Sequence, residues 1–505
     1  MDYLFYVYFA FVFALTVSPS VITFSCVFVL GLVAMLLGSR ELKKHSRVLE
    51  LKTVSSDMSY QRLFVICFLI VLTGSIIYWL GFYPGGFNLD AYGQWDQAHG
   101  MIGYNDWHPL ISTLLIQLST KICDSFAFCI LVQIIAFSFS VALLLSTLYQ
   151  YGVCRKIILA ITAFTALNPA IALNTISLTK DVQFTILAVL LVDILLRIYF
   201  TEGKWLSGVW RYLYLALLSS MICLVRHNGI LYVAPTLFLL MFLYRSTMRQ
   251  VLYISILVAL CITAVKVPIS ALLNVAPHDN PVGEAVGIPM AIMANALVSE
   301  PESIPEEVHD FLNDIADDAD WNEYYCLGEW DSCKWIFSRA TLIKEISPST
   351  LFKYTLQTIE SCPESAYDSF RANTQIVWQP VMSKRYWIPE VYIEENEYNI
   401  RQKPIGLFSN VAAILTQLSC FFPLNIFCWN TGFQIILIML ALLFARGRRY
   451  NTAAFLYLPL LVYDLGTMLL LAGPNQRYFY CNAVLFLPLT VSVQLERGNV
   501  CRNDS

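Results

Sequence analysis

The chain has 505 residues, of which 57% are apolar and only 13% are charged. Soluble proteins carry charge on about a quarter of their residues, so this composition excludes a compact soluble enzyme and predicts a membrane protein. The net charge of −4 hides an uneven distribution, because residues 273–405 hold 22 of the 36 acidic side chains and 9 of the 32 basic ones. That segment carries a net charge of −13 and the rest of the chain +9. The basic residues form short clusters between apolar runs, which excludes a nucleic-acid-binding surface and is typical of cytoplasmic loops.

The N-terminal residues 1–62 predict a transmembrane hairpin followed by a basic loop. The first 37 residues are nearly all apolar and are divided by Ser18-Pro19-Ser20, which indicates two closely spaced spans and not a cleavable signal peptide. Basic residues then place residues 40–62 in the cytoplasm; they are Arg40, Lys43, Lys44, Arg47, Lys52 and Arg62.

Residues 63–272 predict a transmembrane core whose polar loops lie alternately outside and inside. The expected spans are 63–82, 125–148, 157–173, 182–200, 212–225, 229–244 and 251–272, with an outer loop at 83–108 and a further apolar stretch at 109–122. Residues 273–405 contain no apolar run of span length, and we expect them to form one soluble, mainly helical extracytoplasmic domain, with helices near 305–320 and 348–373.

Residues 406–496 predict the C-terminal transmembrane helices, and residues 497–505 a cytoplasmic tail. Arg446, Arg448 and Arg449 favour a cytoplasmic loop, so the expected spans are 430–445, 453–471 and 480–494. If residues 406–424 also crossed the membrane, these arginines would lie on the outer side. We therefore interpret residues 406–424 as an interfacial or re-entrant helix, with a tight hairpin as the alternative. The sequence thus predicts an all-α polytopic membrane protein with about twelve spans and both termini in the cytoplasm.

Polar clusters fall at the outer ends of the predicted spans. The first outer loop supplies Asp90, Gln94, Asp96, Asp106 and His108, and later loops supply Lys180-Asp181, Arg226-His227-Asn228-Gly229 and Arg477-Tyr478. Charged residues at a membrane are costly and are usually paired or functional, so their convergence on one face predicts a site.

Each cluster also has a structural interpretation. Asp90 could cap a helix that begins near Ala91, Asp106 could be a loop residue beside an interfacial tryptophan, and His108 an interfacial histidine. Lys180 and Asp181 could form a local pair at a helix start. Lone arginines such as Arg226 or Arg477, and Lys266 near the outer end of its span, could extend to lipid headgroups.

The sequence contains no nucleotide-binding or zinc-binding motif and 14 cysteines. Most of the cysteines lie in or beside apolar runs, where cysteine behaves as a small apolar residue. Cys326 and Cys333 could form a disulfide within the outer domain, although Cys362 is left over as an odd third cysteine.

An outer-face site with a carboxylate and several cations suits a reaction on a lipid-linked, phosphorylated substrate. Arginine and lysine side chains would hold the phosphate, and a carboxylate would take the proton of an acceptor hydroxyl as its oxygen attacks an anomeric carbon. The energy is already present in the lipid-phosphate bond, so no nucleotide is required.

The order of short motifs resembles a bacterial membrane family known only as a domain of unknown function, and more distantly the GT-C superfamily of glycosyltransferases. The resemblance covers roughly residues 63–490 and rests on Tyr83-Pro84-Gly85 with Asp90 and Gln94, Asp106-Trp107-His108-Pro109, Lys180-Asp181, Arg226-His227-Asn228-Gly229, Gly287-Ile288-Pro289 and Arg477-Tyr478. It implies a polyprenyl-phosphate sugar donor and a catalytic Asp90. The adjacent acidic pair of many GT-C enzymes is lacking, since Asp90 and Asp96 are six residues apart, which leaves open whether a divalent cation bridges Asp90 and Asp106.

The leading hypothesis is a glycosyltransferase of the cell membrane that acts on its outer face, with a lipid-linked donor and a cell-envelope glycan or lipid as acceptor. Asp90, Asp106 and His108 are the predicted catalytic residues. The predicted substrate-binding residues are Gln94, Lys180, Asp181, Arg226, His227, Asn228, Arg477 and Tyr478. The alternatives are a polymerase or ligase of lipid-linked oligosaccharides and a transporter or flippase; a flippase should show charges at mid-membrane and internal repeats. A purely structural scaffold would not need Arg226 and Arg477.

Overall fold

The computed structural model of the protein describes residues 2–45, 58–277, 286–337, 347–382, 391–444, 452–492 and 495. Among these residues the regular secondary structure is helical, and the extended segments form only isolated β-bridges. The predicted all-α class is therefore confirmed for this part of the chain. The arginines expected in the loop at 446–449 and the tail at 497–505 lie outside the described residues.

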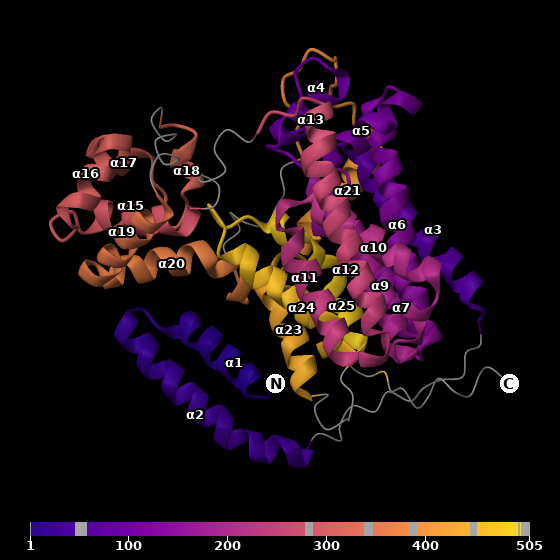
Figure 1. The fold of residues 1–505 in the computed structure, drawn as a ribbon, viewed down its shortest axis with the longest axis horizontal. Helices are drawn as coiled ribbons and strands as arrows, with labels where there is room; N and C mark the ends of the chain where they lie inside the picture. The colour runs from indigo at the N-terminus through magenta and orange to yellow at the C-terminus, as the bar shows by residue number, and fades with distance from the viewer. Residues whose placement is uncertain are drawn as a thin grey trace.

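The N-terminal segment forms a helical hairpin, α1 (Asp2–Val17) and α2 (Val21–His45), which turns where the sequence predicts a break. The turn contacts α20 (Pro363–Trp378), which lies next to the hairpin in Figure 1. The backbone N–H of Val21 donates to a carboxylate oxygen of Glu364 at 3.0 Å, and the Tyr367 hydroxyl donates to the carbonyl of Ser18 at 3.2 Å.

The main bundle contains the helices that carry the predicted spans (Figure 1). In chain order they are α3 (Tyr60–Gly81), α5 (Leu110–Ile122), α6 (Phe126–Gln150), α7 (Arg155–Leu167), α8 (Pro169–Thr175), α9 (Lys180–Phe200), α10 (Val209–Val225), α11 (Ile230–Leu243) and α12 (Met248–Ala264), which continues through a π-helical turn (Val265–Ile269) into α13 (Ser270–Leu272). The helices α6, α9 and α25 (Tyr480–Ser492) pack against one another, and their apolar side chains belong to one large core.

Four helical segments of the described chain are long and apolar enough to cross a membrane, namely α3, α6, α9 and the continuous run Arg245–Leu272. The helices α7 and α8 would make a fifth if the pair, bent by 59°, is one span. This is fewer than the twelve or so spans that the sequence predicts. The apolar runs at 109–122, 212–225, 229–244, 430–445, 453–471 and 480–494 form shorter helices, of 10 to 17 residues.

The difference has a physical cause. A run of apolar residues predicts burial, but burial inside a bundle and burial in lipid leave the same pattern in the sequence. The helix α5 has 13 residues, which corresponds to about 20 Å, against a hydrocarbon core of about 30 Å. Two of the short helices stop at polar segments that form the site described below, since α10 ends just before Arg226 and α25 begins just after the turn that holds Arg477.

The acidic segment contains α15 (Gly287–Ser299), α16 (Glu306–Ile315), α17 (Asp318–Tyr324), α18 (Asp331–Lys334), α19 (Pro348–Ser361) and α20. Its helices share an apolar cluster of their own around Trp321 and Trp330. The helix predicted over 348–373 is two helices, because Pro363 begins a new one. Gly287 lies directly against the carbonyl oxygen of Leu471, so any side chain there would overlap the backbone at the end of α24 (Thr452–Met468).

Residues 391–405 leave the helices of the acidic segment and return to the first loop, next to α4 (Leu89–His99) in Figure 1. The N–H of Phe87 donates to the carbonyl of Tyr392 at 2.8 Å, and the N–H of Glu394 donates to the carbonyl of Phe87 at 2.7 Å. Further along, the N–H of Lys403 donates to the carbonyl of Tyr83. The end of the acidic segment is thus joined to the loop that holds Asp90.

The C-terminal third begins with α21 (Gly406–Ser419), which packs beside α3 and turns into the short α22 (Leu424–Trp429). It continues with α23 (Thr431–Phe444), α24 and α25. Whether residues 406–424 enter the membrane stays a prediction. All cysteines of the described residues are free, so the disulfide considered for Cys326 and Cys333 does not form.

Candidate active site

Charged side chains from five separate segments meet at one end of the main bundle. The contributing segments are the start of α4, the loop before α5, the start of α9, the end of α10 and the 3-10 turn Gln476–Phe479 before α25. They bring together Asp90, His108, Lys180, Asp181, Arg226 and Arg477, all of which the sequence singles out.

Asp90 lies at the centre of this cluster. One of its carboxylate oxygens, Oδ2, accepts a hydrogen bond from Nη1 of Arg477 at 2.7 Å. The other oxygen, Oδ1, lies 3.8 Å from Nε2 of His108. The side chains of Asp90 and Arg477 are 27% and 24% exposed, so this pair is open to solvent while the groups around it are buried.

Asp90 does not cap its helix. The helix α4 begins at Leu89, and Asn88 is its N-cap, whose side-chain oxygen accepts the N–H of Ala91 at 3.0 Å. The capping interpretation of Asp90 is therefore wrong, because Asn is as good an N-cap residue as Asp and already occupies the position. Asp90 falls in the first helical turn, where a carboxylate is also favoured by the helix dipole.

The charges around Asp90 keep it ionised. Burial alone would raise the pKa of the Asp90 carboxyl, but Arg477, His108 and Lys180 outweigh burial and lower it to about 2. An aspartate with this pKa is a weak base while Arg477 holds it. A ligand anion that takes over Arg477 would raise the pKa of Asp90 and make it a stronger base.

His108 is a neutral link between Lys180 and Asp90. Burial lowers its pKa, and the charge of Lys180 lowers it further, to about 3. The ammonium of Lys180 lies 3.0 Å from Nδ1 of His108. Because an ammonium can only donate, Nδ1 is the acceptor, and the ring proton therefore sits on Nε2, the nitrogen that faces Asp90.

A second carboxylate, Asp181, is buried behind the first and is shared by two arginines. It forms an ion pair with Arg226, and the exposed fractions of the two side chains are 2% and 6%. Nε of Arg477 lies 3.3 Å from Oδ2 of Asp181, although neither atom forms a well-aligned hydrogen bond. Arg477 thus lies between the two carboxylates.

Arg226 is enclosed by aromatic rings. Its guanidinium carbon lies 5.5 Å from the ring centre of Phe184, 5.8 Å from that of Tyr463 and 5.2 Å from that of Tyr478. Such contacts stabilise a buried cation by about 1–2 kcal/mol each at most. Sequence reasoning missed Phe184 and Tyr463, because aromatic residues at helical spacing in an apolar span look the same as ordinary core residues.

Asp106 and His227 form a neighbouring group. The ammonium of Lys266 lies 2.6 Å from a carboxylate oxygen of Asp106, so Lys266 is paired and does not extend to lipid headgroups. Nε2 of His227 lies 3.2 Å from the backbone carbonyl of Asp106. Asp106 therefore pairs with a residue of the π-helical turn that continues α12, and Asp90 pairs with Arg477.

Gln94 and Asp96 form hydrogen bonds with residues outside the cluster. The buried amide of Gln94 donates to the hydroxyls of Ser112 and Thr113 at 2.9 and 3.3 Å, which joins α4 to α5. Asp96 accepts a hydrogen bond from the Tyr398 hydroxyl at 2.7 Å. Asn228 lies in the 3-10 turn His227–Gly229, and the ring of Tyr478 lies beside both Arg226 and Arg477. The role in substrate binding expected of Gln94 stays a prediction.

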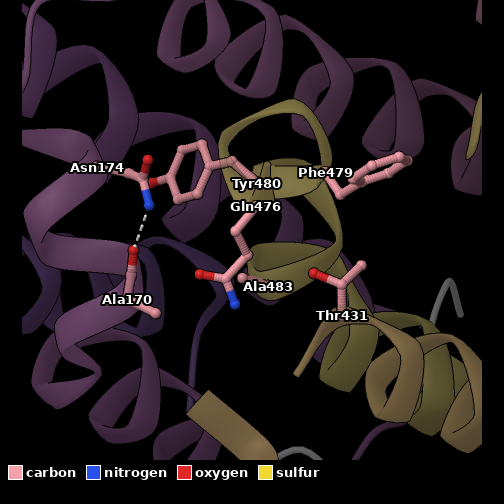
Figure 2. A pocket seen from close by; sticks show the side chains of 7 residues that line it. All are labelled: Ala170, Asn174, Thr431, Gln476, Phe479, Tyr480 and Ala483. Atoms are coloured by element: carbon pink, nitrogen blue, oxygen red, sulfur yellow. Dashed lines mark hydrogen bonds between the residues drawn. The ribbon is translucent and has the colours of Figure 1, made fainter. Parts of the chain in front are cut away.

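A small pocket with a volume of about 10 Å³, room for about one water molecule, lies behind the turn that holds Arg477 (Figure 2). It is lined by Ala170, Asn174, Thr431, Gln476, Phe479, Tyr480 and Ala483. Pockets that hold organic ligands usually measure at least about 300 Å³. The pocket therefore belongs to the packing between α8, α23 and α25, where the amide of Gln476 donates to the carbonyl of Trp429.

The described residues do not fit a divalent cation. No group of three or more His, Cys, Asp or Glu side chains among them is placed to hold a metal ion. Asp90 is paired with Arg477 and Asp106 with Lys266, so each carboxylate already has a cationic neighbour. A metal ion that bridged Asp90 and Asp106 would have to displace both cationic side chains.

The fold and the site together define an all-helical protein with helices of membrane length and a charged cluster at one end. The chain belongs to a family of unknown function (DUF6020), whose match covers residues 104–495. No curated protein sequence shows significant similarity to it.

One solved structure that resembles the chain is the archaeal oligosaccharyltransferase AglB from Archaeoglobus fulgidus, in complex with an inhibitory peptide and a dolichol-phosphate. The TM-score is 0.40 and the sequence identity is 11%, over 86% of this chain and 50% of AglB. The chain thus spans about half the length of that enzyme.

Proposed function

We propose that the protein is a membrane glycosyltransferase that moves a sugar from a polyprenyl-phosphate donor to a cell-envelope glycan or lipid at the outer face of the cell membrane. The observation that carries the proposal is the partly exposed pair of Asp90 and Arg477, flanked by Lys180 and His108. A guanidinium binds phosphate well, and an ionised carboxylate can accept the proton of a hydroxyl group.

In this reaction the donor phosphate would compete with Asp90 for Arg477. The phosphate would form charge-assisted hydrogen bonds with the guanidinium, and Asp90 would lose its strongest electrostatic partner. The pKa of Asp90 would then rise from about 2, so donor binding itself would activate the base. This order of events keeps the base inactive until a donor is present.

The bonds and charges balance without a further reactant. The acceptor oxygen forms a bond to the anomeric carbon, and the bond between that carbon and the phosphate oxygen breaks. The polyprenyl phosphate leaves with the electron pair, stabilised by Arg477, and the acceptor proton moves to Asp90 and then to water. Arg226 would not touch the phosphate, because aromatic rings and Asp181 enclose it; it would hold Asp181 and, through it, Arg477.

The outer location rests on the distribution of basic residues, which places the loops with Asp90 and Arg477 opposite the basic loop at 40–62. The experiment that tests the function supplies the purified protein, in lipid nanodiscs, with radiolabelled undecaprenyl-phosphate hexoses and a membrane lipid and glycan extract. We expect loss of the labelled donor and transfer of label to a new product. An unchanged donor with every hexose and extract tested would contradict the proposal.

A further inference from the structure

A pair of tryptophans lies at the edge of the charged cluster. Trp107 immediately precedes His108, and its ring centre lies 5.4 Å from that of Trp335, with an angle of 53° between the rings. Trp335 follows α18, the helix of the acidic segment that lies on the side facing the main bundle (Figure 1). We call Trp107 and Trp335 the tryptophan pair.

Trp335 is largely accessible to solvent. Its side chain is 66% exposed and is not part of the core cluster that holds Trp321 and Trp330.

The position of Trp335 relative to the cluster is fixed by the backbone. The N–H of Asp331 donates to the carbonyl of Ala472 at 3.0 Å, which attaches α18 to the loop that leads to Arg477. On the other side, Trp107 is covalently joined to His108, whose ring faces Asp90. The tryptophan pair therefore lies next to the charged cluster.

Polar groups border the exposed ring. The ammonium of Lys334 lies 5.0 Å from the ring centre of Trp335 and 2.6 Å from a carboxylate oxygen of Asp331. A flat aromatic face next to groups that donate and accept hydrogen bonds matches the two surfaces of a pyranose ring. The C–H bonds of the sugar face carry a slight positive charge and stack on the negative face of the indole, while the hydroxyls at the ring edge need hydrogen-bonding partners.

We propose that the tryptophan pair binds a sugar ring of the acceptor, so that the acceptor of this protein is a carbohydrate. The inference rests on the proposed function. It assigns the acceptor and not the donor, because the two oxygens of Asp90 face different ways. Oδ2 faces Arg477, where the donor phosphate would bind, and Oδ1 faces His108, the residue that follows Trp107 in the chain. An acceptor stacked on Trp335 would approach Asp90 from the side that the donor leaves open.

The test measures sugar binding without turnover. Wild-type protein in nanodiscs is titrated with cellohexaose, maltohexaose and chitohexaose, and binding is followed by saturation-transfer NMR. We expect at least one hexasaccharide to bind, W335A to bind it about ten-fold more weakly, and W335F, which keeps a ring, to lie within about three-fold of wild type. The matched control is W210A, because Trp210 is 83% exposed at the far end of α10 from Arg226; it should bind like wild type.

Three results would overturn the inference. They are the failure of all three hexasaccharides to bind, equal binding by W335A and wild type, and quenching of Trp335 fluorescence by brominated lipids, which would assign the ring to the membrane surface. The proposed function is tested separately by donor consumption. Trp335-dependent sugar binding without any transfer would reject the transferase and keep the carbohydrate site, whereas transfer that W335A leaves unchanged would reject only the acceptor assignment.

Discussion

The two ends of α9 both hold a carboxylate paired with an arginine, but the pairs are built in opposite ways. At the C-terminal end, Asp193 and Arg197 are one helical turn apart and form a hydrogen bond of 2.8 Å. Arg197 also donates to the hydroxyl of Thr147 at 2.6 Å. At the N-terminal end, Asp181 is paired with Arg226 and approached by Arg477, from two segments far away in the sequence.

The difference separates a structural pair from a site. The pair at the C-terminal end is local in sequence and its donors are used within the protein, so it needs no ligand. The cluster at the N-terminal end brings three cations and two carboxylates together from separate segments, and contains a close contact between Arg477 and Asp181 that is not aligned as a hydrogen bond. Burying such charges is expensive, and the cost is more readily explained by a ligand than by stability.

The largest effect is expected from D90N. Loss of a positioned base lowers the rate by about 10² to 10⁴, so turnover of lipid-linked sugar should fall by that factor while the melting temperature stays close to wild type. Asn88 remains as the helix cap, so the substitution tests the carboxylate alone. The matched control is D96N in the same helix, whose partner is Tyr398; it should keep most of the turnover. Equal activity in D90N and wild type would show that the base is elsewhere.

A second substitution, R226A, should act on stability. Removal of one partner from a buried ion pair costs about 3–5 kcal/mol, because the other charge is left without compensation. Thermal unfolding in detergent should therefore show a marked drop in melting temperature. If R226A unfolds like wild type and loses only donor binding, Arg226 contacts the phosphate and the division of roles between the two arginines is wrong.

A third substitution, R477K, should act on the donor. Lysine keeps the charge but cannot form two parallel hydrogen bonds to phosphate, so KM for the donor should rise about ten-fold. The corresponding change at the other end of α9, R197K, should leave KM unchanged. If R477K and R197K both raise KM, or if neither does, the distinction between a site at one end of α9 and a structural pair at the other is wrong.

The smallest expected effect concerns pH. The pKa of His108 in the folded protein is about 3, below its value of about 6.5 in an unfolded chain. Between these values the unfolded state binds more protons, so His108 makes the protein less stable as the pH falls from 6.5. At pH 5 the loss amounts to roughly 1–2 kcal/mol. The fall in melting temperature from pH 7 to pH 5 should therefore be smaller in H108Q, and an unchanged pH dependence would contradict a buried, neutral His108.

Long apolar helices and the meeting of the polar clusters follow from the sequence for simple reasons. The runs at 63–82, 125–148 and 182–200 are long enough to define helices by length alone, and the structure places helices there. Charged residues at the ends of spans are costly unless they pair with one another. This explains why Asp90, Lys180 and Arg477 meet. Their roles in catalysis stay predictions.

Other features depend on contacts that a sequence does not display. Helix α10 ends just before Arg226 and α25 begins just after the turn that holds Arg477, which apolar periodicity does not reveal. The choice of Asn88 over Asp90 as helix cap depends on one backbone turn. The pairing of Asp106 with Lys266 joins residues 160 positions apart. Trp335 has no helical or strand pattern around it, so nothing in the sequence connects it with Trp107.

The return of residues 391–405 to the first loop also makes the position of Asp90 depend on the acidic segment. Both backbone groups of Phe87, three residues before Asp90, are bonded to residues 392–394, and on its other side Gly86 is bonded to Ile176 and Leu178. The start of α4 is therefore attached to the rest of the protein on two sides. Cleavage of the backbone between Tyr392 and Lys403 would weaken one of these attachments. Every charged residue of the cluster would remain, but the orientation of the Asp90 carboxylate would lose this support.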